Sequence, residues 1–168
     1  MTTDSQKVAL VTGGARGIGK ATVDRFVRGG LKVVATDISP NNDLLNNAHV
    51  LAHVHDVSSS DSWSYVLDVV SKEFGRLDIL VNNAGIGTLP DVEEEDESGW
   101  QEMLDVNAKS IWLGIKAVIP LMRSNHSGSI VNVSSIFGAS GGFGKSAAYH
   151  ASKGVVSAVT RNAAIRYA

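Results

Sequence analysis

The stretch KVALVTGGARGIGK, residues 7–20, joins a β-branched apolar run to a glycine-rich loop and then to a helical pattern. The apolar run predicts a buried strand, and the helical pattern that follows the loop ends at a glycine pair, which is typical of a helix stop. Within the loop, Gly13, Gly17 and Gly19 have the spacing Gly-x-x-x-Gly-x-Gly. Glycine at such a junction permits a tight turn and lets backbone N–H groups approach a pyrophosphate. A glycine-rich turn that binds nothing would have the same pattern.

The rest of the chain repeats this alternation of strand and helix. The apolar runs are nearly continuous rather than alternating, as expected for parallel strands that are buried on both faces. We therefore predict an α/β fold with a doubly wound, Rossmann-type parallel sheet and helices on both faces, in a single domain over residues 1–168. The expected strands are 7–12, 32–37, 49–56, 78–85 and 129–135, and the expected helices are 17–30, 59–75, 97–125 and 146–168.

Composition excludes several classes of protein. The net charge of -2 gives no electrostatic footprint for nucleic acid, and the absence of cysteine excludes disulfides, thiolate metal sites and cysteine nucleophiles. The opening MTTDSQKVALVTGG has no charged and apolar leader pattern, and no apolar run approaches the length that spans a membrane. We expect a cytoplasmic protein with no membrane partner, and a solvated loop at the acidic run 91–97.

Asp37 ends the second apolar run, about 20 residues after the glycines, where an acidic side chain can accept hydrogen bonds from ribose hydroxyls. A turn or capping aspartate is the alternative interpretation. Together with the glycine loop, Asp37 predicts a dinucleotide site. Its carboxylate would repel a 2′-phosphate, which favours NAD over NADP, whereas Arg16 inside the loop weakly favours NADP.

Further motifs follow in a fixed order: HDV at 55–57, NNAG at 82–85, Asn107, a serine pair at 134–135, and YHASK at 149–153. With the glycine loop, this set resembles the short-chain dehydrogenase/reductase family of single-domain NAD(P)-dependent oxidoreductases. The resemblance implies a homo-oligomer, dimer or tetramer. It also implies further strands after Ala168, so we expect the chain to be incomplete at its C-terminus, which leaves the activity of a 168-residue chain open.

The resemblance also assigns residues to the cofactor. It places Asp56 against the adenine ring and the stretch from Asn82 to Gly85 beside the cofactor, where it supports the sheet. An ordinary strand-end turn would explain that stretch as well. The expected cofactor-binding set is Gly13, Arg16, Gly17, Ile18, Gly19, Asp37, Asp56, Val57, Asn83, Ala84, Gly85, Tyr149 and Lys153.

Tyr149 and Lys153 stand four residues apart on a predicted helix, so both can face one cleft. A nearby ammonium favours the phenolate form of a tyrosine, which could then exchange a proton with an alcohol or ketone oxygen while hydride moves. A surface Tyr/Lys pair is the alternative. Ser135 ends the preceding strand, where its hydroxyl can hold the substrate oxygen, and the resemblance gives this role to the second serine rather than to Ser134. The interval from Ser135 to the tyrosine is one residue longer than the commonest family spacing.

Asn107 matches the fourth catalytic position of the family, thought to anchor a water in a proton relay to Lys153, although a mid-helix asparagine that bonds locally is the alternative. The predicted catalytic set is thus Asn107, Ser135, Tyr149 and Lys153. Among the histidines, His53 and His55 share one strand face without a third ligand, and His150 is expected to point elsewhere on its helix. No metal site is predicted.

The leading functional hypothesis is an NAD-dependent short-chain dehydrogenase/reductase (EC 1.1.1.-) that acts as an alcohol dehydrogenase or ketone reductase on a small molecule. One alternative is the epimerase/dehydratase branch, whose glycine spacing is usually Gly-x-x-Gly-x-x-Gly. Another is a non-catalytic or truncated NAD-binding protein. The substrate pocket is expected between GIGTLPDV, residues 85–92, and IFGASGGFGKS, residues 136–146.

Overall fold

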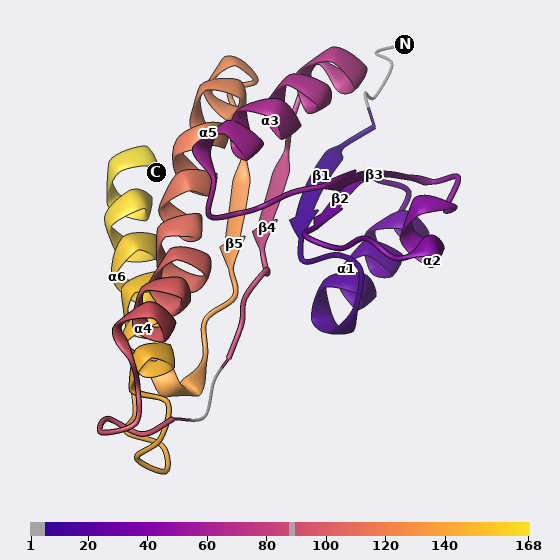
Figure 1. Cartoon of the computed structure of the whole chain (residues 1–168). Helices are drawn as coiled ribbons and strands as arrows, with labels where there is room; N and C mark the ends of the chain where they lie inside the picture. The colour runs from indigo at the N-terminus through magenta and orange to yellow at the C-terminus, as the bar shows by residue number, and fades with distance from the viewer. Residues whose placement is uncertain (1–5, 88–89) are drawn as a thin grey trace.

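The computed structural model describes residues 6–87 and 90–168, and it contains a five-stranded parallel sheet with helices packed on it (Figure 1). The sheet order is β3-β2-β1-β4-β5. In chain order the elements are β1 Val8–Thr12, α1 Gly17–Arg28, β2 Lys32–Asp37, α2 Asn42–Leu45, β3 Val50–Val54, α3 Ser60–Phe74, β4 Ile79–Asn82, α4 Glu97–Leu104, the π-helical turn η1 Asp105–Lys109, α5 Ser110–Ser124, β5 Ser129–Asn132, the 3₁₀ turn η2 Ile136–Gly138 and α6 Ala147–Tyr167.

The strand order reverses at β1, which pairs with β2 on one side and with β4 on the other. Side chains from α3 and α5 cover one face of the sheet, and α1 with α2 covers the other face. Helix α6 packs on α5 beside β5 through Val156, Ile111 and Ile115. The predicted doubly wound parallel sheet is confirmed. In such sheets ligands bind where the order reverses, at the carboxyl ends of the strands.

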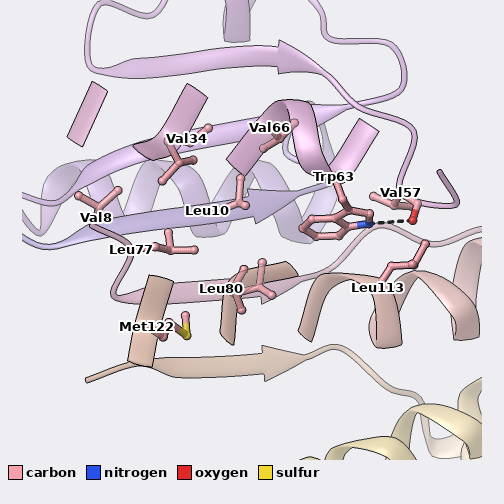
Figure 2. Close-up of a cluster of buried hydrophobic side chains, with 12 residues drawn as sticks. Val8, Leu10, Val34, Val57, Trp63, Val66, Leu77, Leu80, Leu113 and Met122 are labelled. Atoms are coloured by element: carbon pink, nitrogen blue, oxygen red, sulfur yellow. Dashed lines mark hydrogen bonds between the residues drawn. The ribbon is translucent and has the colours of Figure 1, made fainter. Parts of the chain in front are cut away.

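The larger core lies between β1, β4, α3 and α5, and Trp63 stands at one end of it (Figure 2). The Trp63 side chain is 1% exposed, and its Nε1 donates a hydrogen bond to the carbonyl oxygen of Val57 at 2.9 Å. This bond fixes the loop between β3 and α3 to the core. The same loop carries Asp56, so the core sets the position of one predicted cofactor residue.

The two outer strands differ from the prediction that every strand is buried on both faces. The central strands β1, β2 and β4 are largely buried, whereas β3 and β5 are only partly covered. Val54 at the end of β3 is 62% exposed and Val131 in β5 is 49% exposed. The prediction was wrong for these strands because their places at the two edges of the described sheet leave them less covered.

The predicted long helix over 97–125 is a helical run with a change of winding in its middle. Helix α4 passes into the π-helical turn η1, and α5 then continues. Helix α3 begins and ends as the sequence predicts: the Ser59 side chain accepts a hydrogen bond from Ser62 N, and Gly75 closes the helix in the left-handed conformation. Residues 91–96 form an irregular, mostly exposed segment, and Glu97, the last residue of the predicted loop, is instead the first residue of α4. Among the helices in the described ranges, none is both long and apolar enough to cross a bilayer.

Candidate functional site

Gly13 and Gly19, in and just after the loop between β1 and α1, have no room for a larger residue. Gly13 and Gly17 have φ angles of +65° and +56°, in the region that favours glycine. A Cβ on Gly13 would lie 2.9 Å from the Cα of Ala84, and one on Gly19 would lie 2.0 Å from the carbonyl oxygen of Gly13. The loop therefore packs against the end of β4, and its backbone is held close to the first turn of α1.

Asp37 ties the end of β2 to this loop. Its Oδ2 accepts a hydrogen bond from Ala15 N at 3.1 Å, and its Oδ1 accepts one from Ser39 N at 3.1 Å. The side chain of Asn41 donates to the carbonyl oxygen of Ala15 at 2.8 Å. Asp37 is only partly buried, so its carboxylate is both fixed and accessible. Arg16, which precedes the first turn of α1, is exposed.

Asn83 holds β1 and β4 together at their carboxyl ends. Its Nδ2 donates to the carbonyl oxygens of Thr12 at 2.9 Å and Gly13 at 3.1 Å. The hydroxyl oxygen of Thr12 accepts hydrogen bonds from the backbone N–H groups of Asn83 and Ala84, at 3.0 and 3.1 Å. These contacts give the Asn83–Ala84 pair the sheet-supporting place that the sequence predicts.

Asp56 and Val57 follow β3 at the outer part of this region. Asp56 is exposed, and its Oδ1 accepts hydrogen bonds from both the hydroxyl and the backbone N–H of Ser58, at 2.7 and 2.9 Å. The hydrogen bond from the Ser58 hydroxyl is the main reason that the pKa of Asp56 is lowered. The lowered pKa keeps the carboxylate ionised. Val57 is buried, so only its backbone could face a ligand.

Tyr149 and Lys153 lie near the start of α6, as predicted, with the Lys153 ammonium 5.8 Å from the centre of the tyrosine ring. Lys153 is 5% exposed, and its Nζ donates to the carbonyl oxygen of Val133 at 3.0 Å. Burial lowers the pKa of Lys153 from its ordinary value. A buried ammonium is thus held at one point between β5 and the tyrosine.

Asn107 lies in the π-helical turn and is completely buried. Its Nδ2 donates to the carbonyl oxygen of Ile86 at 2.9 Å and to the hydroxyl of Ser152 at 3.2 Å, while its Oδ1 accepts from Ile86 N at 2.8 Å. Asn107 Nδ2 also lies 3.0 Å from Met103 Sδ, one turn earlier in the helical run, so its bonding is partly local, as the alternative expects, and extends to Ile86 and Ser152 in other segments of the chain. A Cβ on Gly85 would lie 3.0 Å from Asn107 Oδ1 and 3.5 Å from Lys153 Nζ, so both polar groups border Gly85.

The two serines after β5 make different contacts. Ser134 Oγ donates to the carbonyl oxygen of Lys153 at 3.1 Å and thereby holds α6. Ser135 Oγ accepts a hydrogen bond from Phe137 N at 3.2 Å, a contact that leaves its own O–H available to donate. The Ser135 hydroxyl can therefore donate to a ligand, and its role in holding a substrate oxygen stays a prediction.

A cavity of about 590 Å³ joins the two halves of the site. Ser134 is among the residues that line this cavity. Ser135, which follows it along the chain, is not, and neither are Asp37 and Asp56. A larger hollow of about 750 Å³, between α5, β5 and α6, contains none of the predicted residues. The lining of the smaller cavity is Ile18, Asn83, Gly85, Ile86, Gly87, Val133, Ser134, Phe137, Phe143, Lys145, Ser146, Tyr149, His150 and Lys153. Residues 88–89 of the predicted substrate loop lie outside the described residues.

His150 differs from its prediction, because it lines the same cavity as Tyr149. Its ring stacks on Phe137 with centroids 4.8 Å apart, and its Nδ1 lies 2.9 Å from the carbonyl oxygen of Ser146. Helical spacing alone rotates residue 150 away from residue 149, but the loop before α6 returns over it. His53 and His55 pack against aromatic rings of α3. In the part of the chain that the structure describes, no three histidine, aspartate or glutamate side chains are grouped to hold a metal.

Comparison with known proteins agrees with this geometry. The sequence model of a family described as short chain dehydrogenase matches residues 7–168. The chain belongs to that family. Members are oxidoreductases that use NAD or NADP.

Three relatives illustrate the range of similar proteins. Cyclopentanol dehydrogenase of Comamonas testosteroni is 41% identical over 172 residues, which cover 96% of this chain and 67% of the relative. The 3-alpha-(or 20-beta)-hydroxysteroid dehydrogenase of Mycobacterium tuberculosis is 42% identical over 139 residues, covering 80% of this chain and 54% of the relative. The crystal structure of levodione reductase superimposes with a TM-score of 0.89 at 32% identity, covering 96% of this chain and 66% of that one. The chain thus spans about two thirds of the length of the relatives that it matches throughout.

Proposed function

We propose that this chain binds NAD and interconverts a secondary alcohol and a ketone, with Tyr149 as the acid/base group. One observation carries the proposal: Tyr149 and the buried Lys153 line a cavity that also reaches Ile18, Asn83 and Gly85, next to the glycine loop. A proton-transferring pair and a dinucleotide loop that share one cavity are what hydride transfer between a cofactor and a substrate requires.

The loop residues fit a dinucleotide. The positions of Gly13 and Gly19 have no room for a Cβ, so the loop packs closely against the end of β4. The backbone N–H groups at the start of α1 can then hold a pyrophosphate. Asp37 would accept hydrogen bonds from ribose hydroxyls, and Asp56 would face the adenine. Because Asp37 is accessible and anchored, a 2′-phosphate would meet its charge, which supports NAD over NADP despite the exposed Arg16.

In the direction of oxidation, bound NAD supplies the hydride acceptor, and the substrate loses a hydride from carbon and a proton from oxygen. Tyr149, in its phenolate form, takes that proton, and release of the proton to solvent or to a relay restores the phenolate. The Lys153 ammonium, fixed by Val133, stabilises negative charge on the phenol oxygen. Ser135 donates its O–H to the substrate oxygen. Asn107 contacts Ile86 and borders Gly85, where it would anchor a water that leads to Lys153.

The relatives' names are those of dehydrogenases and a reductase, which supports the oxidoreductase class for this chain. The glycine spacing argues against the epimerase/dehydratase branch. A non-catalytic binder would not need Asn107, Ser135, Tyr149 and Lys153 as a set. A homo-oligomer, a single domain and a cytoplasmic location stay predictions.

The test is NADH or NADPH formation by the 168-residue chain across a panel of secondary alcohols, with nucleotide affinities measured in parallel. The proposal expects NADH formation with at least one alcohol and weaker binding of NADP. Nucleotide binding without turnover of any alcohol would favour the non-catalytic alternative, and failure to bind either nucleotide would refute the proposal.

A further inference from the structure

Phe137 is the centre of an aromatic group beside the proposed catalytic residues, and neither the cofactor nor the proton chemistry uses it. Its ring is stacked on His150, with planes 20° apart. The edges of its ring meet Tyr149 at 6.3 Å and Phe143 at 6.5 Å between centroids, both nearly perpendicular. These four rings, which we call the aromatic wall, all line the cavity that contains Lys153.

The loop before α6 is seated on this wall by a glycine. Gly142 has a φ of +53°, and a Cβ there would lie 2.8 Å from His150 Nε2 and 2.9 Å from Phe137 Cε1. The close approach places the next residue, Phe143, at the mouth of the cavity, where its side chain is 93% exposed. An exposed aromatic ring that lines a cavity together with other aromatic rings is a feature of a binding site rather than of a core.

We propose that the aromatic wall is a substrate subsite that selects apolar, ring-bearing secondary alcohols and ketones, with Phe143 as the residue that determines this specificity. The inference rests on the proposed function, since it places the ring of the substrate next to Tyr149. The carbinol carbon lies near the tyrosine, and the remainder of the ring lies along Phe137 and under Phe143.

The shape of the aromatic wall and the conformational entropy of the substrate both favour ring-bearing substrates. Flat aromatic side chains give a rigid ring broad apolar contact, and the stacked Phe137–His150 pair keeps that surface in place. A closed ring has already lost the torsional freedom that an open chain of the same carbon number must lose on binding. Among the described residues that line the cavity, Lys145 and Lys153 are the charged ones, and most of the others are apolar. The ammonium of Lys153 is held by Val133.

The experiment compares two ketones of equal carbon number, cyclooctanone and 2-octanone, with the 168-residue chain saturated with NAD, which cannot reduce them. Dissociation constants are measured by calorimetry, and the oxidation of the matching alcohols is followed by NADH formation. Phe143→Ala is the test variant. Ile136→Ala is the matched control, because Ile136 is 78% exposed in the same segment and does not line the cavity.

We expect the cyclic ketone to bind about tenfold more tightly than the open-chain ketone, and Phe143→Ala to remove most of that preference with NAD affinity unchanged. Ile136→Ala should retain it. Equal binding of the two ketones, or a preference that survives in Phe143→Ala, overturns the inference. A ring preference in binding without turnover of either alcohol supports the subsite and refutes the proposed function. Turnover of both alcohols with no ring preference supports the proposed function and refutes the subsite.

Discussion

The two halves of the proposed site are built differently. On the side of β1, β2 and β3, side chains and backbone form a closed set of hydrogen bonds: Asp37 holds Ala15, and Asn83 holds Thr12 and Gly13. On the side of α6, a buried lysine, a partly exposed tyrosine and an exposed Phe143 line an open cavity. One half is fixed before any ligand arrives, and the other half keeps groups free to react.

The two halves of the site should respond differently to amino-acid substitution. The nucleotide half uses backbone geometry, so its residues serve the fold and the cofactor together. The catalytic half uses side-chain chemistry on α6, which packs on α5 through Val156 and is also held by hydrogen bonds from Ser134 and Asn107. Substitutions in the first half should therefore cost stability and binding at once, and substitutions in the second should cost turnover with little loss of stability.

The largest effect is expected for Gly19→Ala. Its Cβ would lie 2.0 Å from the carbonyl oxygen of Gly13 and 2.6 Å from Asn83 Nδ2, so the first turn of α1 must move away from both. We expect a loss of about 3 kcal/mol in the free energy of unfolding, together with loss of measurable NAD binding. Urea denaturation and nucleotide titration measure the two quantities.

The matched control for this prediction is Gly17→Ala. Gly17 has a φ of +56° but no atom within 4 Å of an added Cβ, so only the backbone penalty of about 1 kcal/mol is expected. Equal losses for the two variants would contradict the close packing assigned to Gly19.

The nucleotide half should also be the acid-sensitive half, because of His55 at the end of β3. This residue is 1% exposed, and its Nδ1 lies 3.0 Å from the hydroxyl of Thr36. Burial lowers the pKa of His55 to about 4, partly offset by the charge of Asp56. In the unfolded chain His55 binds a proton below about pH 6.5, whereas in the folded chain it does so only near pH 4. The free energy of unfolding is therefore unaffected by this group above pH 6.5 and decreases as the pH falls towards 4. The contribution of this group amounts to about 3 kcal/mol.

Denaturation at several pH values tests this expectation. His55→Gln should flatten the slope between pH 6.5 and 4, whereas His126→Gln, at an exposed position, should keep it. The lowered pKa values of Asp56, Asp78 and Asp96 act at lower pH, because stability from those groups is lost only below their ordinary value of 3.8. An unchanged slope in His55→Gln would remove the histidine from the explanation.

A smaller effect is expected for Asp37→Ser, which should lower the preference for NAD over NADP by about tenfold, or 1.4 kcal/mol. The serine removes the charge that would meet a 2′-phosphate, and it also weakens the hold on Ala15, so affinity for both nucleotides should fall somewhat. Titration with each nucleotide gives the ratio. Equal affinities for NAD and NADP in the parent chain would remove the basis of this prediction.

Much of the fold could be predicted because local patterns determine it. Apolar runs predicted the strands, Ser59 and Gly75 predicted the ends of α3, and the motif order predicted the convergence of Gly85 and Tyr149 on one cavity. The edge positions of β3 and β5 could not be predicted, since burial there depends on what packs beside the strand.

The site details that were missed depend on non-local geometry. The π-helical turn that directs Asn107 to Ile86 is a change of winding within a helical pattern, and periodicity does not reveal it. The place of His150 was predicted wrongly because the loop at Gly142, rather than the helix itself, brings the cavity over it. The signal that could have indicated the aromatic wall is the density of aromatic residues at 137, 143 and 149 around that glycine-rich loop.

The central claim is that α6 supplies the chemistry while the glycine loop supplies the cofactor site, and Tyr149→Phe tests it most directly. The substitution removes one oxygen from a partly exposed ring. Turnover of a substrate alcohol should fall by a factor of about 10³, while the NAD dissociation constant changes less than about twofold. Lys153→Met serves as the contrast and should damage both, because Lys153 bonds Val133 and also borders Gly85, one of the predicted cofactor residues. Substantial turnover by Tyr149→Phe would contradict the account and assign the proton transfer to another group.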